Sequence, residues 1–170
     1  MPDLHALDPF CTWLAATPPS QFIQSTEWII PAVQTVHIIA VAAVMTAVLL
    51  LDLRLLRVGG GNGESIAIAA RRLLPLIWWS LPVLLLTGAT LIIAEPARAL
   101  ENPVFALKMG LLLAAALVTL ACQIPLGSDA RFWDLSASRR GAARLIASVS
   151  LPLWIGILFA GRWIAYVQTG

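Results

Sequence analysis

Long uncharged apolar runs alternate with short polar segments along the chain. The first run, from Trp28 to Leu51, carries no formal charge. As an α-helix it would rise about 36 Å, enough to cross a hydrocarbon core of about 30 Å with some tilt. Three similar runs follow, and the pattern predicts spans at residues 28–51, 73–94, 104–126 and 145–167. The predicted fold is therefore an all-α, polytopic membrane protein with four transmembrane helices in a bundle.

Residues 1–27 form an N-terminal segment ahead of the transmembrane domain at 28–167. This segment contains no Lys or Arg, so it lacks the basic start of a secretory signal. Its aromatic residues Phe10, Trp13 and Phe22 favour short pieces lying in the headgroup layer. A flexible tail is an equal alternative for the same residues.

Two other patterns predict how the helices pack and how one loop meets the membrane. Ala40, Ala43 and Ala47 fall on one face of the first span, which lets a neighbouring helix approach closely. Phe132 and Trp133 lie in the polar segment before the fourth span. They are expected to be anchors in the headgroup layer, where amphipathic aromatic rings are enriched.

The composition excludes an ordinary water-soluble globule. The chain is 59% apolar and 12% charged, whereas soluble domains contain about 25% charged residues. Basic residues occur singly or in pairs, so no nucleic-acid surface is expected. The two cysteines, Cys11 and Cys122, are too few for a disulfide framework and are expected toward opposite membrane faces.

The distribution of basic residues predicts the topology. Most of them flank the loop between the first and second spans or the loop between the third and fourth spans: Arg54, Arg57, Arg71, Arg72, Arg131, Arg139, Arg140 and Arg144. Positively charged loops remain in the cytoplasm. The expected location is therefore the bacterial inner membrane, with both termini in the periplasm.

His37 is the candidate site residue of the first span. It lies about 13 Å along the helix from Trp28, beside the alanine face, so its ring is expected to point into the bundle. Lys108, near the start of the third span, and Arg162, near the end of the fourth, lie at the same predicted depth. An ionisable side chain inside the membrane is costly and is a functional-site candidate by default.

A b-type haem is one expected occupant of this site. His37 would be the axial metal ligand, and Lys108 and Arg162 would face the propionates. The sixth ligand would be Met45, Met109, a residue of a partner chain, the His37 of a second copy, or none. A quinone headgroup held by His37, Gln34 and Lys108 is a related alternative.

Structural roles compete with these functional ones. His37 would equally serve as a hydrogen bond between helices, worth about 0.6–2 kcal/mol. Lys108 and Arg162 would equally extend their charges to the headgroups from the helix ends. The chain has no Gly-x-Ser-x-Gly motif and no His, Cys or carboxylate spacing typical of zinc, so no catalytic residue is assigned and the protein is not expected to be an enzyme.

The chain resembles a family of small bacterial four-helix membrane proteins to which no reaction is assigned. The matching residues are Ser25, Trp28, Pro31, His37, Asp52–Leu56, Pro75, Thr87-Gly88, Asn102-Pro103, Phe105, Lys108 and Ser150–Tyr166. The architecture is also distantly similar to copper-resistance-D and cytochrome-b561-type membrane proteins, which implies a redox setting by analogy of fold. Family members often carry an Asn and a His near the end of the third helix. This chain has no histidine there.

The leading functional interpretation is a small, non-catalytic subunit of a larger bacterial membrane assembly for electron transport, with a haem, quinone or pigment contact at His37. The alternative is a free-standing b-type cytochrome that carries electrons through its own haem. A small transporter is a third class, and it would need oligomers. The expected partners are the lipid bilayer and other membrane subunits or a second copy of the chain.

Overall fold

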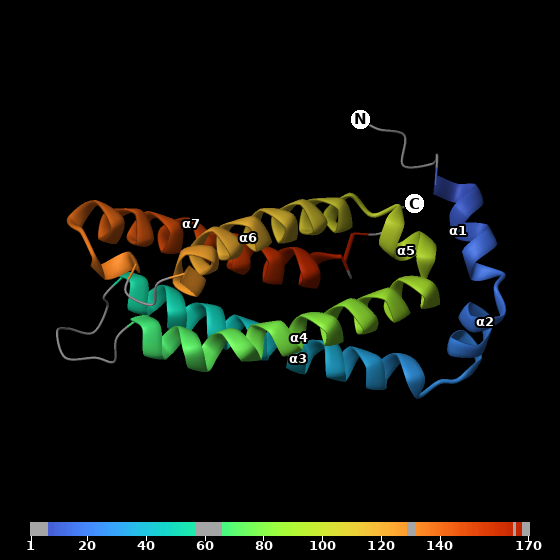
Figure 1. The fold of residues 1–170 in the computed structure, drawn as a ribbon. Helices are drawn as coiled ribbons and strands as arrows, with labels where there is room; N and C mark the ends of the chain where they lie inside the picture. The colour runs from blue at the N-terminus through green and yellow to red at the C-terminus, as the bar shows by residue number, and fades with distance from the viewer. Residues whose placement is uncertain (1–6, 57–65, 129–131, 165, 168–170) are drawn as a thin grey trace.

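The computed structural model describes residues 7–56, 66–128, 132–164 and 166–167, and in these residues it is helical without strands. Four long helices run along a common direction in two layers (Figure 1). They are α3 (Ile29–Leu56), α4 (Ile66–Ala94), α6 (Pro103–Ser128) and α7 (Ala137–Trp163). The short elements are α1 (Asp8–Ala15), α2 (Pro18–Ser25), α5 (Pro96–Leu100) and the 3-10 helix η2 (Phe132–Asp134).

The four long helices are each long and apolar enough to cross a membrane, so the chain is a multi-pass membrane protein. This confirms the predicted all-α bundle. All four helices extend beyond the predicted spans: α3 continues to Leu56, α4 begins at Ile66, α6 is longer by one residue at its start and two at its end, and α7 begins at Ala137. At that start the Ser136 hydroxyl accepts a bond from Arg139 N at 3.2 Å, whereas α7 ends at Trp163, before the predicted end at residue 167. The predicted spans followed hydrophobicity alone, whereas backbone hydrogen bonding continues through the charged residues at the helix ends.

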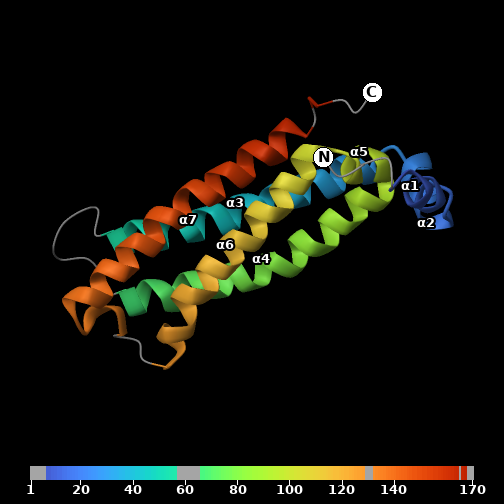
Figure 2. The same ribbon diagram turned by 90° about the horizontal axis from the view of Figure 1, so that it is seen from above.

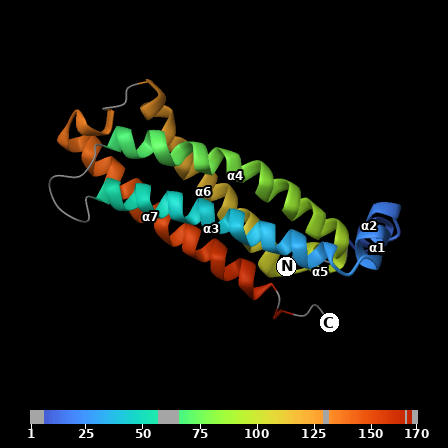
Figure 3. The ribbon, with the colours of Figure 1, turned by 90° about the horizontal axis from the view of Figure 1, so that it is seen from below.

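Helices α3 and α7 form the centre of the bundle. Helix α3 packs against α4 and α7, and α6 packs against α7. Seen from below, α3 lies between α4 and α7 (Figure 3), and Figure 2 shows the same four helices from above. Val44, Ala47 and Trp154 are buried at mid-height. The surface away from this core is apolar: Ile38 is 66% exposed and Leu85 is 74% exposed, as suits contact with acyl chains.

The N-terminal helices cross one end of the bundle (Figure 1). The Ser20 hydroxyl donates to Ile93 O at 2.7 Å, and the Gln24 amide donates to Ala94 O at 2.8 Å. These carbonyls belong to the last turn of α4, where a helix leaves acceptors without intrahelical partners. Of the two alternatives for this segment, the structure therefore has short helical pieces docked on the bundle.

Asn102 holds the same end together from the start of α6. Its side chain is 1% exposed. Its Oδ1 accepts from Val104 N at 2.9 Å, while Nδ2 donates to Ile164 O at 3.2 Å and to Val167 O at 3.1 Å. One side chain thus begins α6 and satisfies carbonyls at the end of α7, so the two helices meet at the end that carries α1 and α2.

The expectation that Trp133 anchors in the headgroup layer is wrong. Trp133 is 5% exposed, and its Nε1 donates to Cys122 O at 3.1 Å at the end of the bundle opposite α1. The ring closes the apolar cluster at that end and meets Phe132 edge-on. The tertiary position of the loop overrides the interfacial preference of the aromatic ring. Cys11 and Cys122 are both free and buried, and they lie at opposite ends of the bundle, as expected.

Candidate functional site

His37 points from α3 toward α4, as predicted. Its Nδ1 lies 2.7 Å from Thr87 Oγ1, and the ring is half-buried. Gly88 follows Thr87, and a Cβ at Gly88 would lie 3.7 Å from His37 Cε1. The Thr87-Gly88 pair therefore supplies both a polar partner and a flat surface for the imidazole.

The hydrogen bonds of Thr87 define the tautomer of His37. The Thr87 hydroxyl donates within α4 to Val83 O at 2.6 Å, so its oxygen must accept from the imidazole. Nδ1 then carries the proton and Nε2 carries the lone pair. Nε2 has no hydrogen-bond partner among the described residues, yet it is not sealed inside the protein. The arrangement leaves one nitrogen able to accept a proton or bind a metal.

Lys108 reaches the same region from α6. Its side chain is half-buried, and its Cε and Nζ would lie 3.6 Å from a Cβ at Gly161 of α7. The ammonium lies within electrostatic range of the His37 ring. Helices α3, α4, α6 and α7 thus each contribute to one region that contains an imidazole and a cation.

The other predicted site residues lie elsewhere. Gln34 is exposed, and Met109 is 45% exposed on the outer side of α6. Met45 is half-buried and packs against the core at mid-height, about 12 Å along α3 from His37. Among the described residues, no three His, Cys, Asp or Glu side chains form a metal-binding group.

Arg162 turns to the surface of α7 instead of toward His37. Its guanidinium donates to Tyr166 OH at 2.7 Å and lies 5.1 Å from the centre of that ring. With Phe159 and Trp163 these two residues line a shallow groove of about 330 Å³. This position suits a headgroup contact at the end of the helix.

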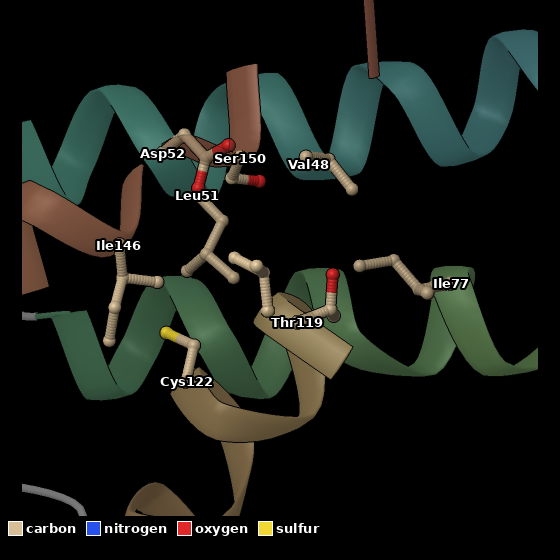
Figure 4. A pocket seen from close by; sticks show the side chains of 9 residues that line it. Val48, Leu51, Asp52, Ile77, Thr119, Cys122, Ile146 and Ser150 are labelled. Carbon is tan, nitrogen blue, oxygen red and sulfur yellow. The ribbon is translucent and has the colours of Figure 1, made fainter. Parts of the chain in front are cut away.

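Asp52 is a candidate that the sequence reasoning missed. The predicted first span ends at Leu51 and leaves Asp52 outside, but Asp52 is 4% exposed and belongs to the buried face of α3. The Ser150 side chain of α7 lies beside its carboxyl group, within hydrogen-bonding reach (Figure 4). Oδ2 is buried and has no hydrogen-bond partner among the described residues. Asp52 lies one helical turn from Val48 and two turns from Val44, and this spacing was the available signal of its burial.

The comparison with protein families covers nearly the whole chain. Residues 20–167 match the model described as a family of unknown function, DUF6644. The chain belongs to the DUF6644 family. The matched region contains both His37 and Asp52, together with all four spans. No curated protein and no solved structure matches the chain.

Proposed function

We propose that this DUF6644 protein is a small, non-catalytic subunit of a bacterial electron-transport assembly in the inner membrane, with both termini in the periplasm, and that His37 contacts a redox cofactor. The observation that carries the proposal is that Nε2 of His37 has no hydrogen-bond partner among the described residues, while Nδ1 of the same ring is hydrogen-bonded to Thr87. A polar group held at this depth, with an adjacent cation, is costly in a membrane protein unless it is used.

A quinol headgroup fits these two side chains best. The lone pair of Nε2 would accept a hydrogen bond from the quinol hydroxyl, and the Lys108 ammonium would stabilise negative charge on the ring oxygen. One imidazole and one cation are sufficient for such a contact. The half-burial of both residues leaves them accessible from the side of the bundle.

A free-standing b-type cytochrome is the second candidate, and the His37–Thr87 bond favours it. Histidine ligands of metals generally donate their second ring nitrogen to a fixed acceptor, as Nδ1 does here. The methionines do not complete the pair, since Met45 is about two turns deeper and Met109 faces outward. The haem would need a sixth ligand from another chain or would have an open position.

The unequal covering of the helices supports assembly with other subunits. In the apolar windows of α4 and α6, 11% and 6% of the residues are buried, compared with 33% for α3 and 28% for α7. The outer sides of α4 and α6 therefore have room for neighbouring membrane helices as well as lipid.

Ligand binding at His37 can be tested in nanodiscs by the quenching of tryptophan fluorescence with decyl-ubiquinol. We expect His37→Ala to weaken binding about tenfold, because one hydrogen bond to a polar partner is lost. Thr87→Val should also weaken it, because the ring loses its orientation. Thr90→Val is the matched control: Thr90 makes the same kind of intrahelical bond, to Leu86 O at 2.8 Å, without touching His37.

An absorption spectrum separates the two candidates. A colourless protein with His37-dependent quinol binding supports the subunit proposal, whereas a Soret band that is lost in His37→Ala supports the cytochrome. Purification from native membranes in mild detergent should yield a larger complex with redox subunits. A pure homo-oligomer that binds quinol equally well with His37→Ala would contradict the proposal.

A further inference from the structure

Asp52 lies in a small cavity where all four long helices meet. Polar lining comes from Ser150 of α7 and from Thr119 and Cys122 of α6, and the remaining lining is aliphatic. Figure 4 shows the carboxyl group of Asp52 beside the Ser150 hydroxyl, with Thr119 and Cys122 entering from α6. The cavity of about 10 Å³ is near the minimum size that holds one water molecule.

The charge of Asp52 has no counterpart among the described residues. No described Lys or Arg forms an ion pair with it, and Arg54, two residues later, is exposed. The polar groups near the carboxyl are neutral or weakly acidic, namely the Cys122 thiol from α6 and the Ser150 hydroxyl from α7. The α4 residue that lines the same cavity is the apolar Ile77. An ionised carboxylate in such surroundings is strongly disfavoured and becomes neutral by binding a proton.

Oδ2 is the atom on which this proton would reside. It is closed to solvent and makes no hydrogen bond within the described chain. A bare carboxylate oxygen would leave several acceptor sites empty, whereas a protonated oxygen becomes a donor. One water in the cavity, bonded to Ser150 or Thr119, would accept that bond.

We propose that Asp52, with Ser150 and one internal water, is a proton-binding site inside the membrane. Loading forms an O–H bond at Oδ2 and breaks one O–H bond of a hydronium ion, which leaves as water, and no electron is transferred. Asp52 is one helical turn from the end of α3 at Leu56, on the side of the arginine-rich loops. The side chains of Leu55 and Trp133 pack in the cluster between the cavity and that end, so they would have to move for the proton to exchange.

The proposal does not depend on the proposed function at His37. The two residues are about 22 Å apart along α3, and they contact different partners: Thr87 of α4 for His37 and Ser150 of α7 for Asp52. Loss of the quinol contact would leave the proton site intact, and the reverse also holds.

The test is infrared difference spectroscopy of the intact protein in nanodiscs, titrated from mildly acidic to alkaline pH. A protonated, buried carboxylic acid gives a carbonyl stretch above the amide band, which shifts down in D₂O. We expect one such band in the wild type and its loss in Asp52→Asn. Glu27→Gln, which removes an exposed carboxyl group, is the matched control and should retain the band.

Ser150→Ala provides a second assignment that does not require removal of Asp52. It should shift the frequency of the same band, because the carbonyl stretch responds to a lost hydrogen bond. If Asp52→Asn fails to fold, this shift still decides the assignment. The proposal would be overturned if the band is absent at every pH or if it is unchanged in both variants. It would also be overturned, in favour of a sodium site, if sodium chloride abolishes the band and choline chloride does not.

Discussion

Polar side chains are hydrogen-bonded differently at the two ends of the bundle. At the end carrying α1 and α2, Ser20, Gln24 and Asn102 each bond to backbone carbonyls at helix termini. Toward the other end, Asp52 Oδ2 and Gln123 Nε2 are buried and have no hydrogen-bond partner in the part of the chain that the structure describes. A satisfied buried group stabilises the fold modestly, whereas an unsatisfied one costs free energy. The polar side chains of the first end are therefore explained by their own hydrogen bonds. At the second end the Trp133 ring is explained in the same way by its bond to Cys122 O, but Asp52 Oδ2 and Gln123 Nε2 are not.

The same contrast exists along α3 alone. His37 is half-buried with one nitrogen bonded to Thr87, and Asp52 is 4% exposed with one oxygen unbonded. The hydrogen bond of His37 is compatible with a role as structural glue between helices. The unbonded oxygen of Asp52 has no such structural explanation among the described residues, and it is therefore the oxygen at which the proton site is proposed.

The largest effect is expected for Asn102→Ala. The substitution removes three hydrogen bonds of a fully buried side chain, including the cap of α6 and the two bonds to the end of α7. We expect the free energy of unfolding to fall by about 2–4 kcal/mol. Reversible unfolding of the protein in mixed detergent micelles measures it. A loss below about 0.5 kcal/mol would show that this end is not held by its polar contacts.

Hydrophobicity and spacing were sufficient to predict the bundle and the inward orientation of His37. The four apolar runs fix the spans, and the alanine face of the first span places His37 toward a neighbour. They were insufficient for Asn102 and Trp133, because the partners of both are carbonyls of other helices, distant in sequence or across a loop. No local pattern records where the ends of α6 and α7 meet.

The prediction failed in a different way for Asp52, because the sequence contains the helical spacing that indicates its burial. An acidic residue two positions before Arg54, at the end of an apolar run, is typical of a membrane boundary. The predicted span therefore ends at Leu51, and it does not follow the helical periodicity further. The buried face of α3 passes through Val44, Val48, Leu51, Asp52 and Leu55. Continuing the helix by five residues beyond Leu51 would have placed the carboxyl group in the core.

Gln123→Met should change the free energy of unfolding in the opposite direction from Asn102→Ala. The Gln123 amide nitrogen, at the end opposite Asn102, is buried and has no hydrogen-bond partner among the described residues. An apolar side chain of similar length therefore removes the free-energy cost of burying that nitrogen, and no described hydrogen bond of the nitrogen is lost. We expect the free energy of unfolding to rise by about 1 kcal/mol in the same unfolding measurement. A loss of similar size would mean that Gln123 has a partner in the membrane, and the contrast between the two ends would be weaker.

The smallest expected effect is on the reactivity of Cys11 in α1, at the end of the bundle that carries α1 and α2. Burial raises the pKa of its thiol, and the nearby Glu101 and Asp8 carboxylates raise that pKa further. Because the thiolate is the reactive form, alkylation at mildly alkaline pH should be slower than for an exposed cysteine. Stability associated with the neutral thiol is present below the ordinary cysteine pKa and is lost as the pH rises through the raised value.

Glu101→Gln should accelerate alkylation of Cys11 only about two- to threefold, because burial is the main cause of the raised pKa and remains in the variant. Mass spectrometry of the Cys11 peptide after timed iodoacetamide treatment measures the rate. Glu95→Gln is the matched control, since Glu95 is exposed at the same end and is paired with Arg98 at 2.7 Å. If the pH at which the alkylation rate is half-maximal shifts and the maximum rate does not change, the effect of Glu101→Gln is electrostatic. A higher alkylation rate at every pH would instead mean that α1 has loosened from α5. The end that carries α1 and α2 would then be less rigid than its contacts imply.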